Sequence, residues 1–302
     1  MNITTQTDFY KVGHIFQYPE GTEFIYSNFT ARSASKFKSF QGQFDNKVVF
    51  FGLQAFIDKF LVDAWQDFFC DSYNIQKYFR RMKNSIGPID ISHFEALFDL
   101  GYLPLLIKAL PEGSRVNIGV PMFTIINTDA RFFRLTNYLE IMISAEVWKT
   151  CTSATIAHQY RKLFDKFAIM TGVPKEFVQW QGHDFSMRGM DGIDSAARSG
   201  AAHLLSFTGT DTIPAIDFLE EFYLANSDEE LIGGSVPATE HSVMSAGGQI
   251  DERETFKRLI TEVYPGGIVS IVSDTWDFWK VLTVIAPSLK EEILARTPDA
   301  FG

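Results

Sequence analysis

FVQWQGHDFSMRGMDGIDSAARSGAAHLLSFTGTD, residues 177–211, is the stretch of this 302-residue chain that most clearly indicates its fold. It opens a series of short apolar segments typical of buried strands, which are FVQWQG (177–182), HLLSFTG (203–209), GGSVPA (233–238) and GGIVSIVS (266–273). Helical stretches follow these segments at about 191–202, 211–225, 241–263 and 275–286. Strands that alternate with helices predict βαβ units and a parallel sheet, because only a crossover connection reaches a parallel neighbour.

Acidic and histidine residues directly follow each apolar segment. They are His183-Asp184, Thr210-Asp211, Glu240-His241 and Ser273-Asp274. Their spacing is close to the roughly 30 residues of one βαβ unit. In a parallel barrel the carboxyl ends of the strands share one face, so we expect these side chains to converge there. The alternative is that Asp and Ser follow strands only because they cap the next helix.

The first half of the chain has an α+β pattern. Strands are predicted at 22–31 and 47–51, a helix at 52–69, strands joined by turns at 104–129, and a mostly helical region from about 131 to 171 that ends at Gly172. We therefore predict an N-terminal α+β domain with a long helical connector at 1–175. A partial (β/α) barrel that carries the active-site loops follows at 176–302. It is expected to be incomplete, because a closed barrel has eight units in typically ~250 residues.

Composition excludes several classes of protein. The chain has 27 basic and 37 acidic residues and a net charge of −10, so it has no uniformly basic surface for nucleic acid. Glu140 and Glu146 interrupt the most apolar run, and the N-terminus lacks the apolar stretch of a signal peptide, so we expect no membrane span. Cys70 and Cys151 are too few for a disulfide framework or a zinc site. We expect them to be inert core thiols in the reducing cytoplasm.

Five motifs carry a resemblance to a known family. They are Asp8-Phe9-Tyr10-Lys11-Val12-Gly13-His14, His183-Asp184-Phe185-Ser186-Met187-Arg188-Gly189, Gly209-Thr210-Asp211-Thr212, Ser235-Val236-Pro237-Ala238-Thr239-Glu240-His241-Ser242 and Ser270-Ile271-Val272-Ser273-Asp274. In this order and spacing, along essentially the whole chain, the motifs resemble those of the nicotinamide phosphoribosyltransferases. The resemblance implies an α/β fold of the type II phosphoribosyltransferase kind. It also implies an enzyme that joins nicotinamide to phosphoribosyl pyrophosphate with Mg²⁺, giving nicotinamide mononucleotide and pyrophosphate in NAD salvage.

The resemblance further implies a homodimer whose active sites lie at the subunit interface. It assigns stacking on the nicotinamide ring to Phe185 and to Tyr10 of the second subunit, with Asp8 near the ring. It assigns the nucleotide phosphate to Arg188 and the pyrophosphate to Arg32 across the dimer. Ser235 and Ser270 are the remaining substrate-binding residues implied in this way.

Three residues are expected to carry the catalytic chemistry. The resemblance implies that ATP can phosphorylate His241, which would couple hydrolysis to product formation. We expect the adjoining Glu240 to orient the His241 imidazole. Asp274 would position Mg²⁺ or the ribose hydroxyls, since Mg²⁺ uses few carboxylates together with substrate oxygens. The structural alternative for His241 is a buried histidine without a catalytic role. We expect this structural role for His14, His93, His158 and His203.

Asp211 is the most informative residue for substrate choice. A carboxylate that faces the carboxamide accepts an N–H hydrogen bond, whereas it repels the carboxylate of nicotinic acid. This disfavours the alternative of a nicotinate phosphoribosyltransferase. A helix N-cap is the structural alternative for Asp211. A dehydrogenase fits poorly, because no Gly-x-Gly-x-x-Gly follows a strand.

Two departures from the family pattern matter. Ser186-Met187 stand where the family usually has Gly-Tyr. The family's Arg-Pro-Asp-Ser-Gly motif and later glycine-rich phosphate loops would begin past residue 302. The second departure leaves a further alternative, a catalytically incomplete fragment that acts as a dimerising or ligand-binding module.

Overall fold

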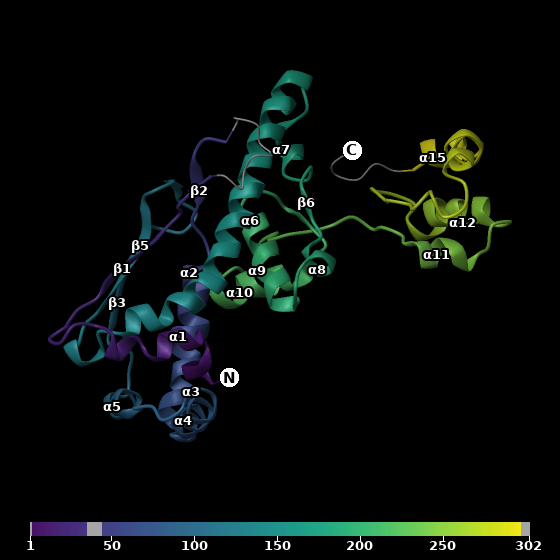
Figure 1. The fold of residues 1–302 in the computed structure, drawn as a ribbon. Helices are drawn as coiled ribbons and strands as arrows, with labels where there is room; N and C mark the ends of the chain where they lie inside the picture. Colours follow the sequence, from purple (N-terminus) through teal and green to yellow (C-terminus); the bar gives the residue numbers. More distant parts are fainter. Residues whose placement is uncertain (1, 35–43, 297–302) are drawn as a thin grey trace. The chain divides into compact units, whose positions relative to one another are not determined.

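The computed structural model describes residues 2–34 and 44–296 and forms two compact units, Met1–Gly234 and Ser235–Gly302 (Figure 1). The sequence pattern changes at 175/176, where we predict the domain boundary. The first compact unit continues past that point, because helix α9 (Ile193–Leu204) packs along the long helix α6 (Leu135–Thr171). The boundary at 175/176 therefore stays a prediction about the sequence domains and does not coincide with the division into compact units.

An antiparallel sheet forms much of the N-terminal part of the first unit. Its strands lie in the order β1 (Tyr26–Thr30), β5 (Pro121–Asn127) and β3 (Leu105–Ala109). Phe29 of β1 faces Phe123 of β5 in register, and their rings stack at 4.9 Å between centroids. A second antiparallel pair joins β2 (Lys47–Val49) to β4 (Arg115–Asn117). The strands predicted in this half of the chain are confirmed.

Helices rich in aromatic residues contribute to the same hydrophobic core as this sheet. Residues 53–70 form an almost continuous helix of α2 (Leu53–Phe56), η4 (Ile57–Asp63) and α3 (Ala64–Cys70), followed by α4 (Tyr73–Ile86) and α5 (Ser92–Leu100). The largest fully buried side chains of the core include Trp65, Phe68, Tyr78 and Phe94. Many of the 29 phenylalanines thus supply apolar area to this core, where burying a large side chain stabilises the fold by about 1.5–3 kcal/mol.

The N-terminal segment lies against these helices as three short turns. They are η1 (Ile3–Thr5), α1 (Phe9–Val12) and η2 (His14–Phe16). Lys11 fixes α1 onto α6, because its buried ammonium group donates hydrogen bonds to Asn137 and Glu140. A buried cation requires such partners, since leaving it unpaired would be strongly unfavourable.

Helix α6 is the longest element and connects the two halves of the first unit. Its 37 residues follow η5 (Ala130–Phe132), and its apolar stripe of Leu135, Tyr138, Leu139 and Met142 is buried. The helix ends at Gly172, which has a φ of 75° and donates its N–H to the Ala168 carbonyl. Glycine takes this left-handed conformation without the Cβ penalty of other residues. The prediction of a long helix that stops at Gly172 is confirmed.

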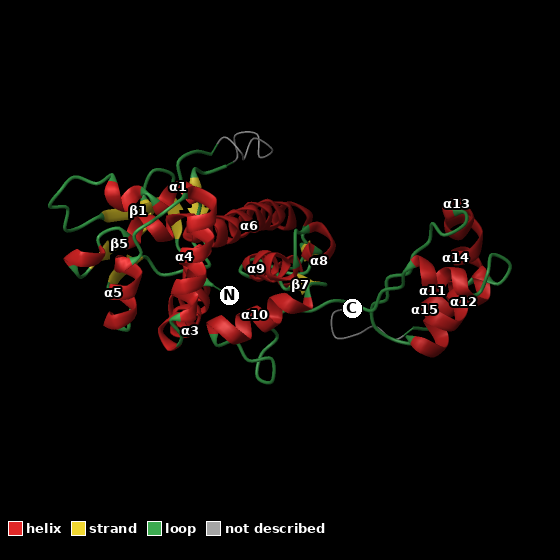
Figure 2. Cartoon of the chain, turned by 60° about the horizontal axis from the view of Figure 1, so that its bottom comes forward, coloured by secondary structure: helices red, strands yellow, loops and turns green. Residues whose placement is uncertain are grey.

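Parallel pairing is present after Gly172, but the strands have only two residues each and lie at the ends of the predicted segments. The elements are α7 (Lys175–Val178), β6 (His183–Asp184), α8 (Ser186–Gly189), α9, β7 (Gly209–Thr210) and α10 (Ile213–Tyr223). β6 pairs with β7 in parallel, and Gly209 forms a parallel bridge with Gly234. The strand prediction was wrong for 177–182, where α7 ends in consecutive turns, and for most of 203–209, where α9 ends. Figure 2 shows α6, α9 and α10 as the helices around these short strands.

The second unit is a small helical body with its own core. Its helices are α11 (His241–Ala246), α12 (Glu252–Arg258), η6 (Leu259–Val263), α13 (Phe278–Lys280), η7 (Val281–Ile285), α14 (Ala286–Ser288) and α15 (Lys290–Leu294). The strand segments predicted at 233–238 and 266–273 meet in this unit only at a parallel bridge between Ala238 and Ser270. Arg296 closes the described part by donating to the carbonyl groups of Ile260 and Gly267. Residues 297–302 lie outside the described residues.

The two cysteines differ in their environment. Cys151 is buried in α6, and burial raises the pKa of its thiol to about 12, so it is inert at neutral pH as expected. Cys70 at the end of α3 is exposed, so its prediction as a core thiol was wrong. It is the terminal residue of the helix, where the apolar face that buries Phe68 has already turned away.

Gly52 provides a test of the packing between the N-terminal domain core and α6. Its φ is 105°, and an added Cβ would overlap the side chain of Thr150, whose hydroxyl donates to the Phe51 carbonyl at 2.6 Å. Gly21 also has a positive φ, of 81°, but an added Cβ there would meet open space. We expect Gly52→Ala to lower the free energy of unfolding by about 1–3 kcal/mol more than Gly21→Ala, since only Gly52→Ala adds overpacking to backbone strain. Urea denaturation of both variants measures this difference, and equal losses would contradict the packing described here.

Candidate active site

The parallel pairing of β6 with β7 brings two predicted site regions together. His183 Nε2 lies 3.4 Å from Asp211 Oδ1, and the Asp211 N–H donates to the Asp184 carbonyl at 2.9 Å. Side chains that are 28 residues apart in sequence thus meet because both strands end at the same edge. The predicted convergence holds for these two strand ends.

Asp184 has a structural role at this edge. Its carboxylate accepts hydrogen bonds from the hydroxyls of Ser186, at 2.6 Å, and Thr212, at 2.5 Å. These bonds connect the turn after β6 to the turn after β7. Ser186, the first of the two residues that depart from the family pattern, is therefore held in place by its hydroxyl, which the usual glycine could not provide.

Phe185 and Arg188 extend from the same loop into solvent. The Phe185 ring is 55% exposed and lies 5.0 Å from the His183 ring centroid. Arg188 is exposed on α8, and it has no hydrogen bond or ion pair with any other described residue. The loop after β6 therefore presents an aromatic face and an uncompensated cation, which suit a planar ring and an anionic group.

A cavity of about 350 Å³ adjoins the loop after β6, and Phe185 is not among its lining residues. Its lining includes His183, Asp184 and Ser186, together with His203 from α9 and Tyr160 from α6. The His203 imidazole is hydrogen-bonded to the Gly209 carbonyl at 3.1 Å and stacks on Phe207. Its structural assignment from sequence is consistent with these contacts.

The second unit contains a histidine–carboxylate pair. His241 Nε2 lies 2.9 Å from Asp274 Oδ1, and both side chains are largely exposed. The Glu240 carboxylate instead accepts a hydrogen bond from the Ser242 hydroxyl. The expected orientation of His241 by Glu240 is therefore corrected, since Asp274 is the hydrogen-bond partner. Glu240 occupies the N-cap position of α11, from which its carboxylate turns toward the first residues of the helix.

Ser235 and Ser270 lie on the two segments of the second unit that lead to this pair. The side chains of both are exposed. The backbone of Ser270 connects the segments, because its N–H donates to the Pro237 carbonyl at 2.9 Å and its carbonyl accepts from the Thr239 N–H at 3.0 Å. These bonds hold Thr239 and Asp274 on neighbouring pieces of chain, so the His241–Asp274 pair is positioned by the backbone.

The N-terminal candidates lie elsewhere in the first unit. Asp8, Tyr10 and Arg32 are exposed, and within the described residues they make no hydrogen bond, ion pair or ring contact with Phe185 or Asp211. The Tyr10 ring contacts His14 edge-on at 5.1 Å. Sequence reasoning missed Lys11, whose buried ion pair determines where Asp8 and Tyr10 lie. The one feature of the sequence that could have indicated Lys11 is its position inside the first family-like motif, between Asp8 and His14.

The structure adds two further observations on metal and membrane sites. Among residues 2–34 and 44–296, no group of three or more His, Cys, Asp or Glu side chains is arranged to hold a metal ion. The helices of the described part of the chain include none with the length and apolarity needed to cross a membrane.

Comparisons with known proteins identify the class. The family model for the nicotinamide phosphoribosyltransferase N-terminal domain matches residues 2–80, and the nicotinate phosphoribosyltransferase family model matches residues 180–301. The fold is similar to that of human nicotinic acid phosphoribosyltransferase, with a TM-score of 0.53 and 17% identity over 80% of this chain and 40% of that chain. It is also similar to nicotinate-nucleotide pyrophosphorylase from Pyrococcus furiosus, with a TM-score of 0.50 and 15% identity over 96% of this chain and 56% of that chain. The chain thus has the α/β fold of the type II phosphoribosyltransferases.

Curated relatives identify the family within this class. The nicotinamide phosphoribosyltransferase of Acinetobacter baylyi is 55% identical over 100% of this chain and 60% of its own length. Those of Xanthomonas campestris and Mycoplasma genitalium are each 32% identical, over 97% and 96% of this chain and 60% and 63% of their own lengths. The chain belongs to the nicotinamide phosphoribosyltransferase family. It spans about 60% of the length of the curated relatives it matches.

His203 gives this region a pH dependence. Burial lowers the pKa of the His203 imidazole below its ordinary value of 6.5, so the unfolded chain binds a proton at a pH at which the folded chain does not. Stability from His203 is therefore present above pH 6.5 and is lost as the pH falls below it. We expect His203→Gln to lose less unfolding free energy between pH 7 and pH 5 than the unchanged protein. Urea midpoints at both pH values measure this, and an unchanged or larger loss in the variant would contradict the assignment.

Proposed function

We propose that this chain supplies the base-binding part of a nicotinamide phosphoribosyltransferase, which forms nicotinamide mononucleotide and pyrophosphate from nicotinamide and phosphoribosyl pyrophosphate. The observation that carries the proposal is the cluster at the ends of β6 and β7, where Asp211, His183 and Phe185 lie together. The 55% identity to a curated nicotinamide phosphoribosyltransferase supports it. The ring nitrogen of nicotinamide attacks the anomeric carbon while pyrophosphate leaves, by analogy with other glycosyl transfers.

The base would lie against the exposed Phe185 ring. An aromatic face orders a flat heterocycle by offset stacking and leaves its nitrogen free to react. Asp211 then accepts an N–H hydrogen bond from the carboxamide, and its charge repels a carboxylate in the same place. His183 stands 3.4 Å from Asp211 and holds that carboxylate at the strand edge.

The anionic groups would be held by arginines and Mg²⁺. Arg188 and Arg32 are exposed and have no partner among the described residues, so neither guanidinium is compensated by a carboxylate of this chain. The guanidinium fork suits phosphate oxygens, and Arg188 adjoins the base-binding loop. We assign Arg188 to the nucleotide phosphate and Arg32 to the pyrophosphate. Mg²⁺ would be bound mainly through pyrophosphate oxygens, with Asp274 as a carboxylate ligand or as the partner of the ribose hydroxyls.

His241 is proposed as the site of phosphorylation by ATP. Because Asp274 accepts the hydrogen bond from Nε2, this tautomer leaves a lone pair on Nδ1, which is the nucleophilic atom. The side chain is largely exposed and therefore accessible to a nucleotide. A phosphorylated His241 would place an additional anion beside the pyrophosphate site.

We also propose that the protein is a cytoplasmic homodimer. Asp8, Tyr10 and Arg32 are exposed, and among the described residues they make no contact with Phe185. In a dimer they could therefore contact the base-binding loop of the second subunit. Ser235 and Ser270 are proposed to contact substrate. The cytoplasmic assignment rests on the two free cysteines, one of which is exposed. Sedimentation equilibrium measures the oligomeric state directly.

Asp211 provides the sharpest test of substrate choice. We expect Asp211→Asn to lower the ratio of kcat/KM for nicotinamide to that for nicotinate by roughly 10-fold, because a charged acceptor is lost and the repulsion of the carboxylate disappears. Asp217→Asn, which removes another exposed carboxylate nearby on α10, should leave the ratio unchanged. Initial rates of mononucleotide formation with each base give the ratio. An unaltered ratio in Asp211→Asn would mean that the base is recognised elsewhere.

The same assay distinguishes the alternative functions. Formation of nicotinamide mononucleotide by the 302-residue chain alone would exclude a catalytically incomplete module. No turnover, with nicotinamide binding that depends on Phe185 and Asp211, would favour that module instead. Preference of the unchanged protein for nicotinate would favour a nicotinate phosphoribosyltransferase, whose family model matches residues 180–301.

Phosphorylation is tested separately with ATP labelled on its γ-phosphate. We expect acid-labile label to appear on the protein, to disappear in His241→Asn, and to fall about tenfold in Asp274→Asn, which weakens the hydrogen bond that fixes the tautomer. His14→Asn is a matched control, because His14 is contacted by Tyr10 rather than by a carboxylate. Label that persists in His241→Asn would place the phosphoryl group on another residue.

A further inference from the structure

The carboxylate of Asp184 joins the two turns that carry the proposed base-binding residues. Its Oδ1 accepts a hydrogen bond from the Ser186 hydroxyl at 2.6 Å. Its Oδ2 accepts from the Thr212 hydroxyl at 2.5 Å and from the Ser186 N–H at 3.2 Å. Ser186 belongs to the turn after β6, whereas Thr212 follows β7 and lies 28 residues beyond Asp184. One side chain therefore bonds to both turns.

Phe185 and Asp211 are each adjacent in sequence to members of this network. Phe185 lies between Asp184 and Ser186, and Asp211 directly precedes Thr212. The backbone adds a further bond, because the Asp211 N–H donates to the Asp184 carbonyl at 2.9 Å. Phe185 nevertheless remains 55% exposed, and the Asp211 side chain is 40% exposed. The network thus fixes the backbone at both positions and leaves the two side chains open to a ligand.

The Thr212 hydroxyl makes this bond in place of its usual local one. Thr212 is the N-cap residue of α10, a position where the threonine oxygen typically accepts from the N–H of the second or third helical residue. Pro214, at the second position, has no N–H, and the Ala215 N–H donates to the Thr212 carbonyl at 3.0 Å. The helix start therefore leaves the hydroxyl available to donate to Asp184.

The packing around the pair leaves little room for another arrangement. Thr212 is 0% exposed. A Cβ added at Gly200 of α9 would lie 3.1 Å from Asp184 Oδ2 and 3.2 Å from Thr212 Cγ2, so α9 covers this side of the bond closely. Exclusion of water strengthens a hydrogen bond. The bond can therefore contribute strongly to holding β6 and β7 together, because their ladder contains only two residue pairs.

We propose that Asp184 and Thr212 are positioning residues that set the selectivity of the base-binding site. This inference rests on the proposed function. The Phe185 ring fixes the plane of the bound heterocycle, so Asp211 meets the carboxamide only if the two turns keep a fixed separation. A misplacement of about 1 Å in such a site can cost about 100-fold in rate. Ser186, in place of the family's usual glycine, supplies this chain with an additional donor to the same carboxylate.

Thr212→Val tests the pair, because it removes the hydroxyl and keeps a side chain of similar shape. We expect calorimetric titration of the 302-residue protein to show that Thr212→Val raises the Kd for nicotinamide about tenfold and leaves the Kd for nicotinate within about twofold. The difference arises because only nicotinamide uses Asp211 as an acceptor. Thr212→Ser keeps the donor, so both Kd values should stay within about twofold of those of the unchanged protein.

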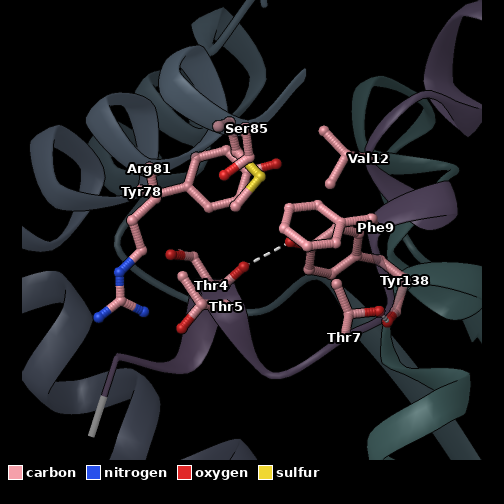
Figure 3. A pocket seen from close by; sticks show the side chains of 10 residues that line it. Thr4, Thr5, Thr7, Phe9, Val12, Tyr78, Arg81, Ser85 and Tyr138 are labelled. Atoms are coloured by element: carbon pink, nitrogen blue, oxygen red, sulfur yellow. Dashed lines mark hydrogen bonds between the residues drawn. The ribbon is translucent and has the colours of Figure 1, made fainter. Parts of the chain in front are cut away.

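Thr4→Val is the matched control for the loss of a buried threonine hydroxyl. Thr4 is also 0% exposed, and its hydroxyl donates to a side-chain oxygen, Asn2 Oδ1, at 2.7 Å. Thr4 lines a separate cavity between η1 and α4, where its carbonyl accepts from the Tyr138 hydroxyl (Figure 3). Thr4→Val should therefore lower the unfolding temperature, as Thr212→Val does, and leave the Kd for nicotinamide unchanged.

Amide hydrogen exchange measures the positioning without any ligand. The N–H groups of Asp211 and Ser186 both donate to Asp184, to its carbonyl and its carboxylate respectively. We expect the exchange of both to become at least about tenfold faster in Thr212→Val, because the bond between the turns is lost. Their exchange should be unchanged in Thr212→Ser and in Thr4→Val.

Three results would overturn the proposal. The first is unchanged exchange of the Asp211 and Ser186 amides in Thr212→Val, since the bond would then fix neither turn. The second is an equal rise of the Kd for both bases, which would indicate a general loss of structure. The third is a Thr212→Ser variant that behaves like Thr212→Val. If the unchanged protein binds neither base, the proposed function fails, and the exchange rates then decide for or against the positioning role.

Discussion

The candidate site depends on the parallel pairing of two very short strands, β6 and β7. His183 is paired with Gly209 and Asp184 with Thr210, and this register brings His183 to within 3.4 Å of Asp211. The approach is close enough that a Cβ on Gly209 would lie 2.7 Å from His183 Nδ1 and 2.9 Å from the Gly182 carbonyl. A side chain at position 209 would therefore force the strands apart. The short distance between His183 and Asp211 therefore depends on a glycine at position 209, and the sequence around Asp211 does not indicate this requirement.

The sequence allowed the longer elements to be predicted, because their signals extend over many residues. The stripe from Leu135 to Met142 and the stop at Gly172 fix α6, and the alternation in β1 and β5 fixes the antiparallel sheet. The apolar segment 177–182 was misassigned, because Phe177 and Val178 belong to α7 and residues 179–182 form turns, while two-residue strands leave no periodic pattern. Hydrophobicity reports burial, and it does not distinguish a strand from a packed turn over so few residues.

The site could be predicted from sequence as a set of positions but only partly as a set of contacts. The placement of acids after successive strands was enough to predict that His183 lies near Asp211, because the ends of parallel strands share one edge of a sheet. The partner of His241 was assigned to its neighbour Glu240, whereas the structure supplies Asp274, 33 residues away. The side chains of Glu240, at the N-cap of α11, and His241, the first residue of the helix, point in different directions. A hydrogen-bond partner that is distant in sequence leaves no pattern in the residues around His241. The buried ion pair of Lys11 could not be predicted for the same reason, because its acceptors Asn137 and Glu140 are on α6, far away in the sequence.

Helix α6 has a mechanical consequence for the first unit. Its first turns hold Lys11 through Asn137 and Glu140, and its later turns line the cavity behind His183 with Tyr160 and Phe164. At 1.5 Å per residue, 37 residues extend over roughly 55 Å, so a bend of about 5° in the middle would shift one end by a few ångströms relative to a straight axis. The length of the helix amplifies a small bend into a displacement at its ends. A small change in the curvature of α6 would therefore alter the distance between Lys11 at one end and the cavity beside His183 at the other.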